Sequence, residues 1–180
     1  MKNAQYIYDN VIIADDINTT KNYCKKAQVG VDLSIKSVES MGVGCTLKNK
    51  TYAAPTSDIP KEHLSYGGID FIGWFLKQGT YTLKLNEGCS FGPHDTGLIV
   101  LRSSLNRSGV SIFSAVWDPG YTSKDGNFIY PMSIRLTVDN PAGFYLEENA
   151  RVAQLLVFEN DETSLYDGQW QGGQTVSKLV

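Results

Sequence analysis

Cysteine and histidine are both scarce in this chain of 180 residues. Its three cysteines, Cys24, Cys45 and Cys89, are far apart in the sequence, and neither histidine, His63 or His94, lies near one of them. An odd, scattered set of thiols cannot form a disulfide framework, and it lacks the Cys-x-x-Cys spacing of a zinc site. The sequence therefore offers little support for a zinc hydrolase or a zinc-dependent deaminase.

Long apolar runs and a strong excess of one charge are also missing. No window approaches the roughly 20 apolar residues of a membrane-spanning helix, and the opening stretch MKNAQYIYDN lacks the apolar run of a secretory signal. The formal net charge of -3 provides no general basic surface for nucleic acid. We therefore expect a cytoplasmic protein that binds neither membranes nor nucleic acid, in which any anion site is a local pocket.

Long helical periodicity is nearly absent, whereas strand-like runs recur. Runs rich in Val, Ile, Thr and Tyr, bounded by Gly, Pro, Asn or Asp, predict strands within 80–88, 96–104, 109–120, 128–140 and 151–160. A parallel βαβ architecture would need crossover helices that this pattern does not contain. The sequence therefore predicts one all-β domain, a sandwich or barrel of the jelly-roll type.

One short run is compatible with a helix. The run SSLNRSG, residues 103–109, is the best candidate for a single helical turn. Ser103 or Ser104 could cap it, and Gly109 could end it. We expect no longer helix.

Two segments differ in composition from the strand-rich body. Residues 49–68 are polar and contain two prolines, which predicts a loop or insertion. Residues 166–180 include three glycines and little apolar surface, so this arm should be mobile unless a ligand or a neighbouring chain orders it. The expected organisation is a β domain at 1–165, with an insertion near 49–68, followed by a C-terminal arm.

Five short polar segments interrupt the strands, and their order and content carry a resemblance. They read VGVDLSI (29–35), LRSSLNRSGV (101–110), AVWDPGY (115–121), ARVAQLLVFE (150–159) and YDGQWQGGQTVSK (166–178). In this order they resemble the five motifs of the trimeric dUTPase and dCTP deaminase superfamily. The runs RSSLNRSGV and DPGY and the tail pattern Tyr-x-Gly-x-aromatic-Gln-Gly resemble its deaminase-like branch. The resemblance implies a distorted jelly-roll or β-clip barrel with very little helix, assembled as a homotrimer.

The stretch WDPGY places a carboxylate before a Pro-Gly bend and a tyrosine after it. Hydrolysis of a nucleoside triphosphate between its α and β phosphates needs a water held in line and a base that polarises it. The resemblance implies that Asp118 orients this water. It also implies that Tyr121 lies under the deoxyribose, where a flat ring leaves no room for a 2′-hydroxyl. Taken alone, the stretch favours a turn with an Asx-type hydrogen bond and a core tyrosine.

The run RSSLNRSG combines two arginines with hydroxyl groups. Guanidinium forks and free backbone N–H groups both bind phosphate oxygens. The resemblance implies that Arg102, Ser103, Ser104 and Arg107 contact the phosphates. A capped surface turn with solvated arginines is the alternative.

The resemblance also assigns roles to Asp32 and to Gln154, of which Gln154 lies on a predicted strand. Asp32 takes the position whose carboxylate, in the family, holds waters around the Mg²⁺ that the triphosphate carries. Mg²⁺ is a hard cation that keeps several of its waters, so a carboxylate can hold it through them. Gln154 is a polar side chain amid aliphatic residues, which is costly to bury without partners. The resemblance places Gln154 at the active site, and an outward-facing strand position is the alternative.

The C-terminal arm is implied to close over the nucleotide. The arm residues implied to contact it are Trp170, Gln171, Gln174, Thr175, Ser177 and Lys178. Glycines between them would let the backbone approach an anion closely. In the family this segment reaches the active site of a neighbouring subunit, which is the reason to expect a homotrimer. A disordered end without a role is the alternative.

One glutamate, present in the deaminases, distinguishes the deaminases of the family from its dUTPases. The deaminases carry a glutamate, in a LExxN pattern, on the strand after the Asp-Pro-Gly bend. Here that strand reads PMSIRLTVDN, with Arg135 near the position and no glutamate between Tyr121 and Glu147. A guanidinium cannot act as a general acid or base at neutral pH.

The sequence therefore predicts a dUTP pyrophosphatase that forms dUMP and pyrophosphate with Mg²⁺. Three alternatives are kept: a dCTP deaminase, a bifunctional deaminase and dUTPase, and a catalytically silent regulatory or binding member of the fold. Another deoxynucleoside triphosphate is a possible substrate, because Arg135 could alter base recognition.

Overall fold

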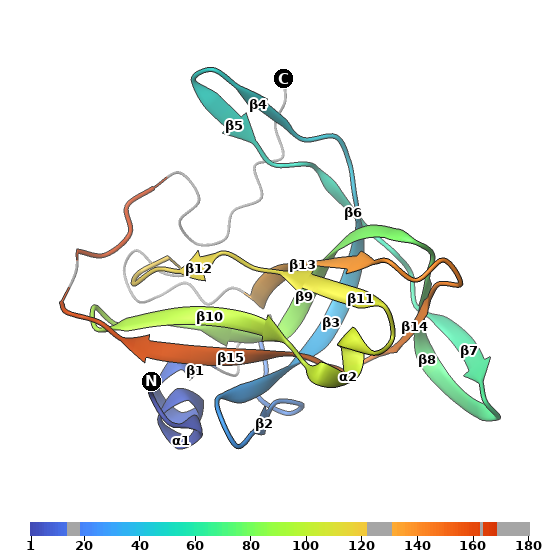
Figure 1. The fold of residues 1–180 in the computed structure, drawn as a ribbon, viewed down its shortest axis with the longest axis horizontal. Coiled ribbons are helices and arrows are strands. Elements are labelled where there is room, and N and C mark those ends of the chain that lie inside the picture. Colours follow the sequence, from blue (N-terminus) through green and yellow to red (C-terminus); the bar gives the residue numbers. More distant parts are fainter. Residues whose placement is uncertain (14–18, 122–130, 163, 169–180) are drawn as a thin grey trace.

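The computed structural model describes residues 1–13, 19–121, 131–162 and 164–168. Strands make up most of this part of the chain (Figure 1). In chain order the elements are α1 (Ala4–Tyr6), the π-helical turn η1 (Ile7–Val11), β1 (Ile12–Ile13), β2 (Lys25–Lys26), β3 (Val31–Met41), β4 (Cys45–Leu47), β5 (Lys50–Tyr52), β6 (Thr56–Asp58), β7 (Glu62–Tyr66), β8 (Ile69–Leu76), β9 (Gly79–Cys89), β10 (Asp95–Leu101), α2 (Ser103–Asn106), β11 (Val110–Phe113), β12 (Val116–Trp117), β13 (Pro131–Val138), β14 (Phe144–Glu147) and β15 (Arg151–Glu159). The expected all-β class is confirmed.

One large antiparallel sheet forms the body of the molecule. Its main path runs β11-β13-β9-β3-β15-β10-β12, and β1, β2 and β6 pair at its sides. The register shifts within β3 between Ile35 and Ser37, and within β15 between Arg151 and Ala153. Such bulges bend strands and increase their twist. The sheet therefore curls, and in Figure 1 β11 and β13 lie above β10 and β15, as in a jelly-roll-like fold.

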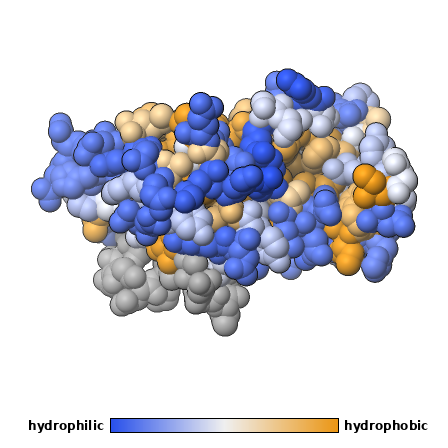
Figure 2. Space-filling model, turned by 90° about the horizontal axis from the view of Figure 1, so that it is seen from below, coloured by the Kyte–Doolittle hydropathy of each residue, from blue (hydrophilic) through white to orange (hydrophobic). Residues whose placement is uncertain are grey.

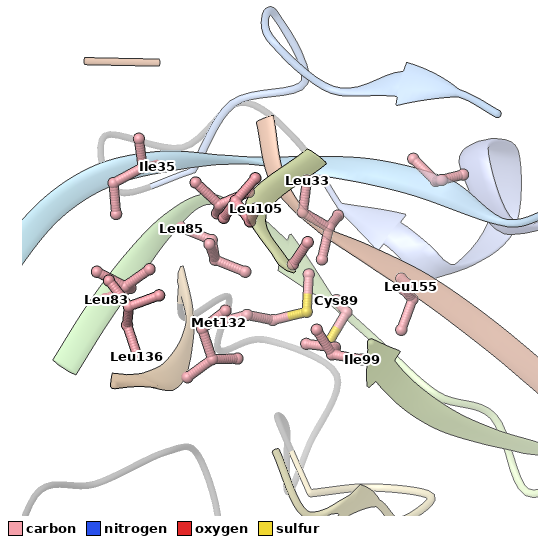
Figure 3. Close-up of a cluster of buried hydrophobic side chains, with 14 of the residues drawn as sticks. Leu33, Ile35, Leu83, Leu85, Cys89, Ile99, Leu105, Met132, Leu136 and Leu155 are labelled. Atoms are coloured by element: carbon pink, nitrogen blue, oxygen red, sulfur yellow. The ribbon is translucent and has the colours of Figure 1, made fainter. Parts of the chain in front are cut away.

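The core fills the inside of the curl. Alternate residues of neighbouring strands face inward, among them Leu83 and Leu85 of β9 and Ile134 and Leu136 of β13, and all four are buried. Figure 3 shows these strands contributing Leu83, Leu85 and Leu136 to one cluster. Each fully buried side chain of this size contributes about 1.5–3 kcal/mol.

The helical turn predicted at 103–109 is present as α2, but its cap differs from the expectation. The N-cap is Arg102, which makes no capping hydrogen bond through its side chain, and Ser103 is the first helical residue. Gly109 has a φ of +72°, a left-handed conformation that glycine adopts without strain. The segment α1–η1 was not predicted, because it is too short to show a period, yet it buries Ile7 and Val11.

Residues 49–68 contain strands where the polar composition suggested a loop. Strand β6 pairs with β3, and β7 pairs with β8 across a two-glycine turn, Gly67-Gly68, with φ values of +61° and +80°. Two successive positive φ values match a type I′ hairpin. The loop expectation was wrong for these stretches, because backbone pairing outweighs their polarity, with the distant strand β3 for β6 and within a local hairpin for β7.

A separate three-stranded sheet, β14-β8-β7, forms one end of the molecule. Hydrophobic side chains reach its surface: Tyr66 and Ile69 are each about two-thirds exposed, and Tyr145 stacks on Tyr66 with 5.0 Å between ring centroids. Figure 2 shows hydrophobic residues at this end beside a mostly hydrophilic face. Within the described ranges, no helix is long and apolar enough to cross a membrane.

Candidate active site

A tight turn after β12 presents Asp118. The backbone N–H of Tyr121 donates to the carbonyl oxygen of Asp118 over 3.1 Å, and Gly120 has a φ of +77°. Proline at the second position and a positive-φ glycine at the third are the pattern of a type II turn. The four letters DPGY therefore determine the local backbone and the direction in which Asp118 leaves it.

Neighbouring chain segments hold this turn in place. The N–H of Gly120 donates to the carbonyl of Phe91 over 3.2 Å, and the N–H of Tyr166 donates to the carbonyl of Pro119 over 2.8 Å. A Cβ atom at Gly120 would lie 2.8 Å from Cβ of Leu165. The turn is thus packed on both sides, so Asp118 stands on a fixed support.

Asp118 lines a cavity of about 390 Å³, which we call the Asp118 cavity. Its lining residues are Thr82, Phe113, Ser114, Ala115, Val116, Trp117, Asp118, Tyr121, Ser133, Ile134, Arg135 and Tyr166. The cavity lies where the chain leaves β11 to pair as β12 with β10, so the strands on its two sides diverge.

Aromatic rings form one wall of the Asp118 cavity. The rings of Trp117 and Tyr121 meet edge to face with 5.3 Å between centroids, and Tyr166 lies 5.4 Å from Tyr121. Burial raises the pKa of the Tyr121 hydroxyl above its ordinary value. A flat apolar wall of this kind suits a planar ring or a sugar face.

Two charged side chains, Asp118 and Arg135, line the cavity without a hydrogen-bond or ion-pair partner among the described residues. Within the part of the chain that the structure describes, the carboxylate of Asp118 and the guanidinium of Arg135 form no hydrogen bond and no ion pair, with each other or with other residues. The Asx-type hydrogen bond considered for Asp118 is therefore absent from these residues. Charges kept apart in an aromatic cavity are available to a polar ligand.

Three predicted residues, Asp32, Arg102 and Gln154, meet at the other end of β10. Together with Arg151, which was not predicted, they form what we call the Arg102 cluster. Strand β3 pairs with β15 so that Asp32 lies opposite Gln154, and β10 pairs on the other side so that Val100 lies opposite Gln154. Arg102 follows the last residue of β10 and so reaches across the ends of both strands.

Contacts within the Arg102 cluster are specific. Nε of Arg102 lies 3.1 Å from Oδ2 of the buried Asp32, and Nη1 donates to the carbonyl of Arg151 over 3.0 Å. A guanidinium has five N–H donors, so three stay available for an anion. The amide nitrogen of the half-buried Gln154 donates to the carbonyl of Val29, so this glutamine is not left without a partner.

The other predicted phosphate ligands extend from this cluster. Ser103, Ser104 and Arg107 are exposed on and just after α2. The predicted arm residues Trp170, Gln171, Gln174, Thr175, Ser177 and Lys178 lie outside the described residues.

The structure does not bring Asp118 and Arg102 together within one chain. Trp117 lies opposite Gly97, in the first half of β10, whereas Arg102 follows its last residue. At about 3.3 Å per residue, Asp118 and Arg102 are therefore on the order of 20 Å apart along the strand. Figure 1 agrees, with β12 above the body of β10 and α2 beyond the arrowhead of β10.

Sequence reasoning missed a buried carboxyl group behind the Arg102 cluster. Glu87 is fully buried, and its oxygens accept from the N–H of Ser34 over 2.9 Å and from its hydroxyl over 2.5 Å. Burial raises the pKa of Glu87 to about 7. The alternation Leu83, Leu85, Glu87 on β9 was the available signal, since it places the glutamate on the inward face.

The described residues fit a metal only in an indirect role. No group of three or more His, Cys, Asp or Glu side chains among them could hold an ion. Asp32 offers a single carboxylate, and one of its oxygens is already taken by Arg102. Such a carboxylate suits a hard cation that keeps its waters.

The fold and the site together define an all-β protein with a pocket for a flat polar ligand and a separate arginine-carboxylate cluster. The model of the dCTP deaminase-like family matches residues 13–160. The chain belongs to this family, within the dUTPase and dCTP deaminase superfamily.

Curated relatives from archaea bear one name. A probable deoxyuridine 5′-triphosphate nucleotidohydrolase of Aeropyrum pernix is 38% identical over 145 residues, which cover 79% of this chain and 82% of the relative. One of the same name from Methanosarcina mazei is 32% identical over 150 residues, covering 81% and 80%. Among solved structures, an EIAV dUTPase aligns with a TM-score of 0.46 at 13% identity, covering 82% of this chain and 93% of that one, and the family assignment does not depend on it.

Proposed function

We propose that the protein hydrolyses dUTP to dUMP and pyrophosphate. The observation that carries this proposal is Asp118, which lines an aromatic cavity from a turn fixed by Pro119 and Gly120 and whose carboxylate has no hydrogen bond or ion pair with the residues that the structure describes. The archaeal relatives are named for this activity, and they match about four-fifths of the chain.

The reaction needs one proton acceptor, and Asp118 supplies it. Its carboxylate accepts a hydrogen bond from a water and aims the water oxygen at the α-phosphorus. As the new P–O bond forms, the bond from the α-phosphorus to the bridging oxygen breaks, and pyrophosphate leaves with that oxygen. Asp118 accepts the proton that the water loses.

The rest of the Asp118 cavity positions the nucleoside. Tyr121 stands edge to face with Trp117, so its ring can lie flat against a deoxyribose. A ring at van der Waals distance leaves no space for a 2′-hydroxyl, which selects deoxynucleotides. The fixed turn keeps Asp118 at a constant position relative to the sugar.

The triphosphate is assigned to the Arg102 cluster and α2. Arg102 keeps three N–H donors after its contacts with Asp32 and Arg151, and the exposed Ser103, Ser104 and Arg107 add further donors. Asp32 would hold, through water, the Mg²⁺ that travels with the triphosphate. When bound, the cation neutralises phosphate charge.

A complete site then requires more than one chain. Asp118 and Arg102 stand on the order of 20 Å apart along β10, which is farther than a compact nucleotide can bridge from one to the other. We propose a homotrimer in which the Asp118 cavity of one subunit faces the Arg102 cluster of the next. The arm at 166–180 would close the site with Trp170, Gln171, Gln174, Thr175, Ser177 and Lys178.

Deamination of dCTP is the competing activity in this family. It needs an acid that shuttles protons to the cytosine ring, and the lining of the Asp118 cavity contains no glutamate. Among the described lining residues Arg135 is the other charged one, and it cannot exchange protons at neutral pH. Pyrophosphate release needs no such second acid.

A substrate panel tests the proposal. The purified protein is incubated with each dNTP and Mg²⁺, and pyrophosphate, ammonia and the product base are measured. We expect dUTP to yield dUMP and pyrophosphate without ammonia. Ammonia from dCTP would reassign the protein as a deaminase, and binding without turnover of any dNTP would make it a regulatory member of the fold.

A further inference from the structure

Arg135 points into the Asp118 cavity from β13. Its neighbours in sequence, Ile134 and Leu136, are buried in the core, so strand alternation turns Arg135 to the opposite face. Pairing places it opposite Phe113 of β11 on one side and Thr82 of β9 on the other. All three of these residues line the cavity.

The guanidinium is held by stacking and not by hydrogen bonds. Its central carbon lies 4.7 Å from the centroid of the Phe113 ring. Contact with an aromatic face fixes the plane of the group and leaves the N–H donors at its edge free. In the described ranges Arg135 has neither a hydrogen bond nor an ion pair, so these donors have no protein partner there.

The donors of Arg135 are selective because a guanidinium cannot accept a hydrogen bond. Uracil carries carbonyl oxygens at positions 2 and 4, whereas cytosine carries an amino group at position 4. An arginine facing position 4 pairs with the uracil oxygen and opposes the cytosine amino group, donor against donor. Thymine has the same carbonyl at position 4 as uracil, so these donors do not separate the two.

The two charged residues reach the cavity from different elements of the fold. Asp118 comes from the turn after β12, and Arg135 comes from β13. With Asp118 serving the α-phosphate, the base extends away from it, and position 4 of a pyrimidine lies across the ring from the bond to the sugar. The stacked guanidinium is therefore placed to meet that end of the base.

We propose that Arg135 is a specificity-determining residue that donates to the 4-carbonyl of the base and so selects uracil over cytosine. This inference rests on the proposed function, since it assumes a pyrimidine deoxynucleotide in the Asp118 cavity. The inference makes a separate prediction: the preference for dUTP over dCTP depends on Arg135, whereas the preference for dUTP over dTTP does not.

The test compares wild type with Arg135→Gln and Arg135→Lys. Glutamine has both a donor and an acceptor and can pair with a 4-amino group, whereas lysine keeps the charge and donates only. kcat/KM is measured for dUTP, dCTP and dTTP, together with equilibrium binding of their nonhydrolysable α,β-imido analogues. Lys50→Gln, which removes the same charge from the exposed hairpin of β4 and β5, is the matched control.

We expect Arg135→Gln to lower the preference for dUTP over dCTP by about tenfold or more, in turnover and in binding. The preference for dUTP over dTTP should stay within about twofold, and Arg135→Lys should keep most of the selection against cytosine. Lys50→Gln should behave as wild type.

Failures of the two proposals are distinguishable. Normal dUTP hydrolysis with an unchanged uracil preference in Arg135→Gln overturns the role of Arg135 and leaves the function standing. If Arg135→Gln loses its preference for dUTP over dCTP and over dTTP to the same extent, the cavity is damaged in general. That result also overturns the role of Arg135. If wild type hydrolyses no nucleotide, the proposed function fails, and the binding ratios of the analogues still decide the role of Arg135.

Discussion

Arg102 and Asp32 form an ion pair within one chain, with 3.1 Å between Nε and Oδ2. The same guanidinium donates to the carbonyl of Arg151, so two different strands fix its plane. The arginine is thereby oriented before a phosphate reaches it, and little side-chain entropy is lost on binding. This contact links the residue assigned to the phosphates with the residue assigned to the cation.

The planar fork of Arg102 is expected to matter more than its charge. Lysine at this position keeps the charge but cannot contact Asp32, Arg151 and a phosphate at once. Arg102→Lys should therefore weaken binding of α,β-imido-dUTP by about 10–100-fold, while Arg102→Ala should weaken it further. Titration calorimetry measures both, with the melting temperature checked for each variant. Wild-type affinity in Arg102→Lys would remove this residue from the phosphate site.

Separation of Asp118 and Arg102 predicts complementation between subunits. Asp118→Asn and Arg102→Ala each damage a different half of the shared site, so either variant alone should be nearly inactive. In the proposed homotrimer, subunits of both variants together form some sites with an intact Asp118 cavity facing an intact Arg102 cluster. Unfolding and refolding the two together should restore a substantial fraction of the activity.

The matched control for this experiment is each variant refolded alone, at the same total protein concentration. Activity in the mixture no higher than in these controls would mean that each site is built within one chain. Co-purification of the untagged variant through an affinity tag carried by the other variant alone verifies that mixed assemblies have formed.

Glu87 predicts a pH dependence of stability. Burial raises its pKa from 4.5 to about 7, although the two hydrogen bonds from Ser34 oppose this shift. A carboxyl group whose pKa is higher in the folded protein binds its proton more tightly there. Its contribution to stability is therefore full below pH 4.5 and is lost as the pH rises through about 7.

The corresponding loss in the free energy of unfolding is at most about 3 kcal/mol. Glu87→Gln removes the titrating group, so its free energy of unfolding should fall less than that of wild type between about pH 5 and pH 8. Urea unfolding at constant protein concentration measures the difference, with the exposed Glu147→Gln as control. Identical pH profiles for wild type and Glu87→Gln would contradict the assignment.

Much of the fold was predictable because local patterns and packing agree. Strands β9, β10, β13 and β15 show alternating or continuous apolar residues that the core also requires, and the predicted ranges cover most of each strand. Strand β6 was not predicted, because its polar residues pair with β3, which only the folded chain brings near. Strand β7 was missed because of its polar composition, although Gly67-Gly68 is a local signal for its hairpin with β8. The register shifts in β3 and β15 have no local signal either.

The site was predictable in parts. The type II turn at Asp118 follows from Pro119 and Gly120 alone, and the cluster of Asp32, Arg102 and Gln154 follows from strand order once the fold is known. The distance between these two groups was not predictable, because it depends on which residues of β10 meet β12. The stacking of Arg135 on Phe113 likewise depends on register across β11 and β13.

Replacing one oxygen of Asp118 tests the central claim most directly. The substitution Asp118→Asn keeps the shape of the side chain and suits the same turn, but an amide cannot accept the proton of the attacking water. The measurement is single-turnover hydrolysis of dUTP by Asp118→Asn, beside its affinity for α,β-imido-dUTP. We predict a fall in rate of roughly 10²–10⁴-fold with affinity within about threefold of wild type. Hydrolysis at the wild-type rate would contradict the assignment of Asp118 and with it the proposed mechanism.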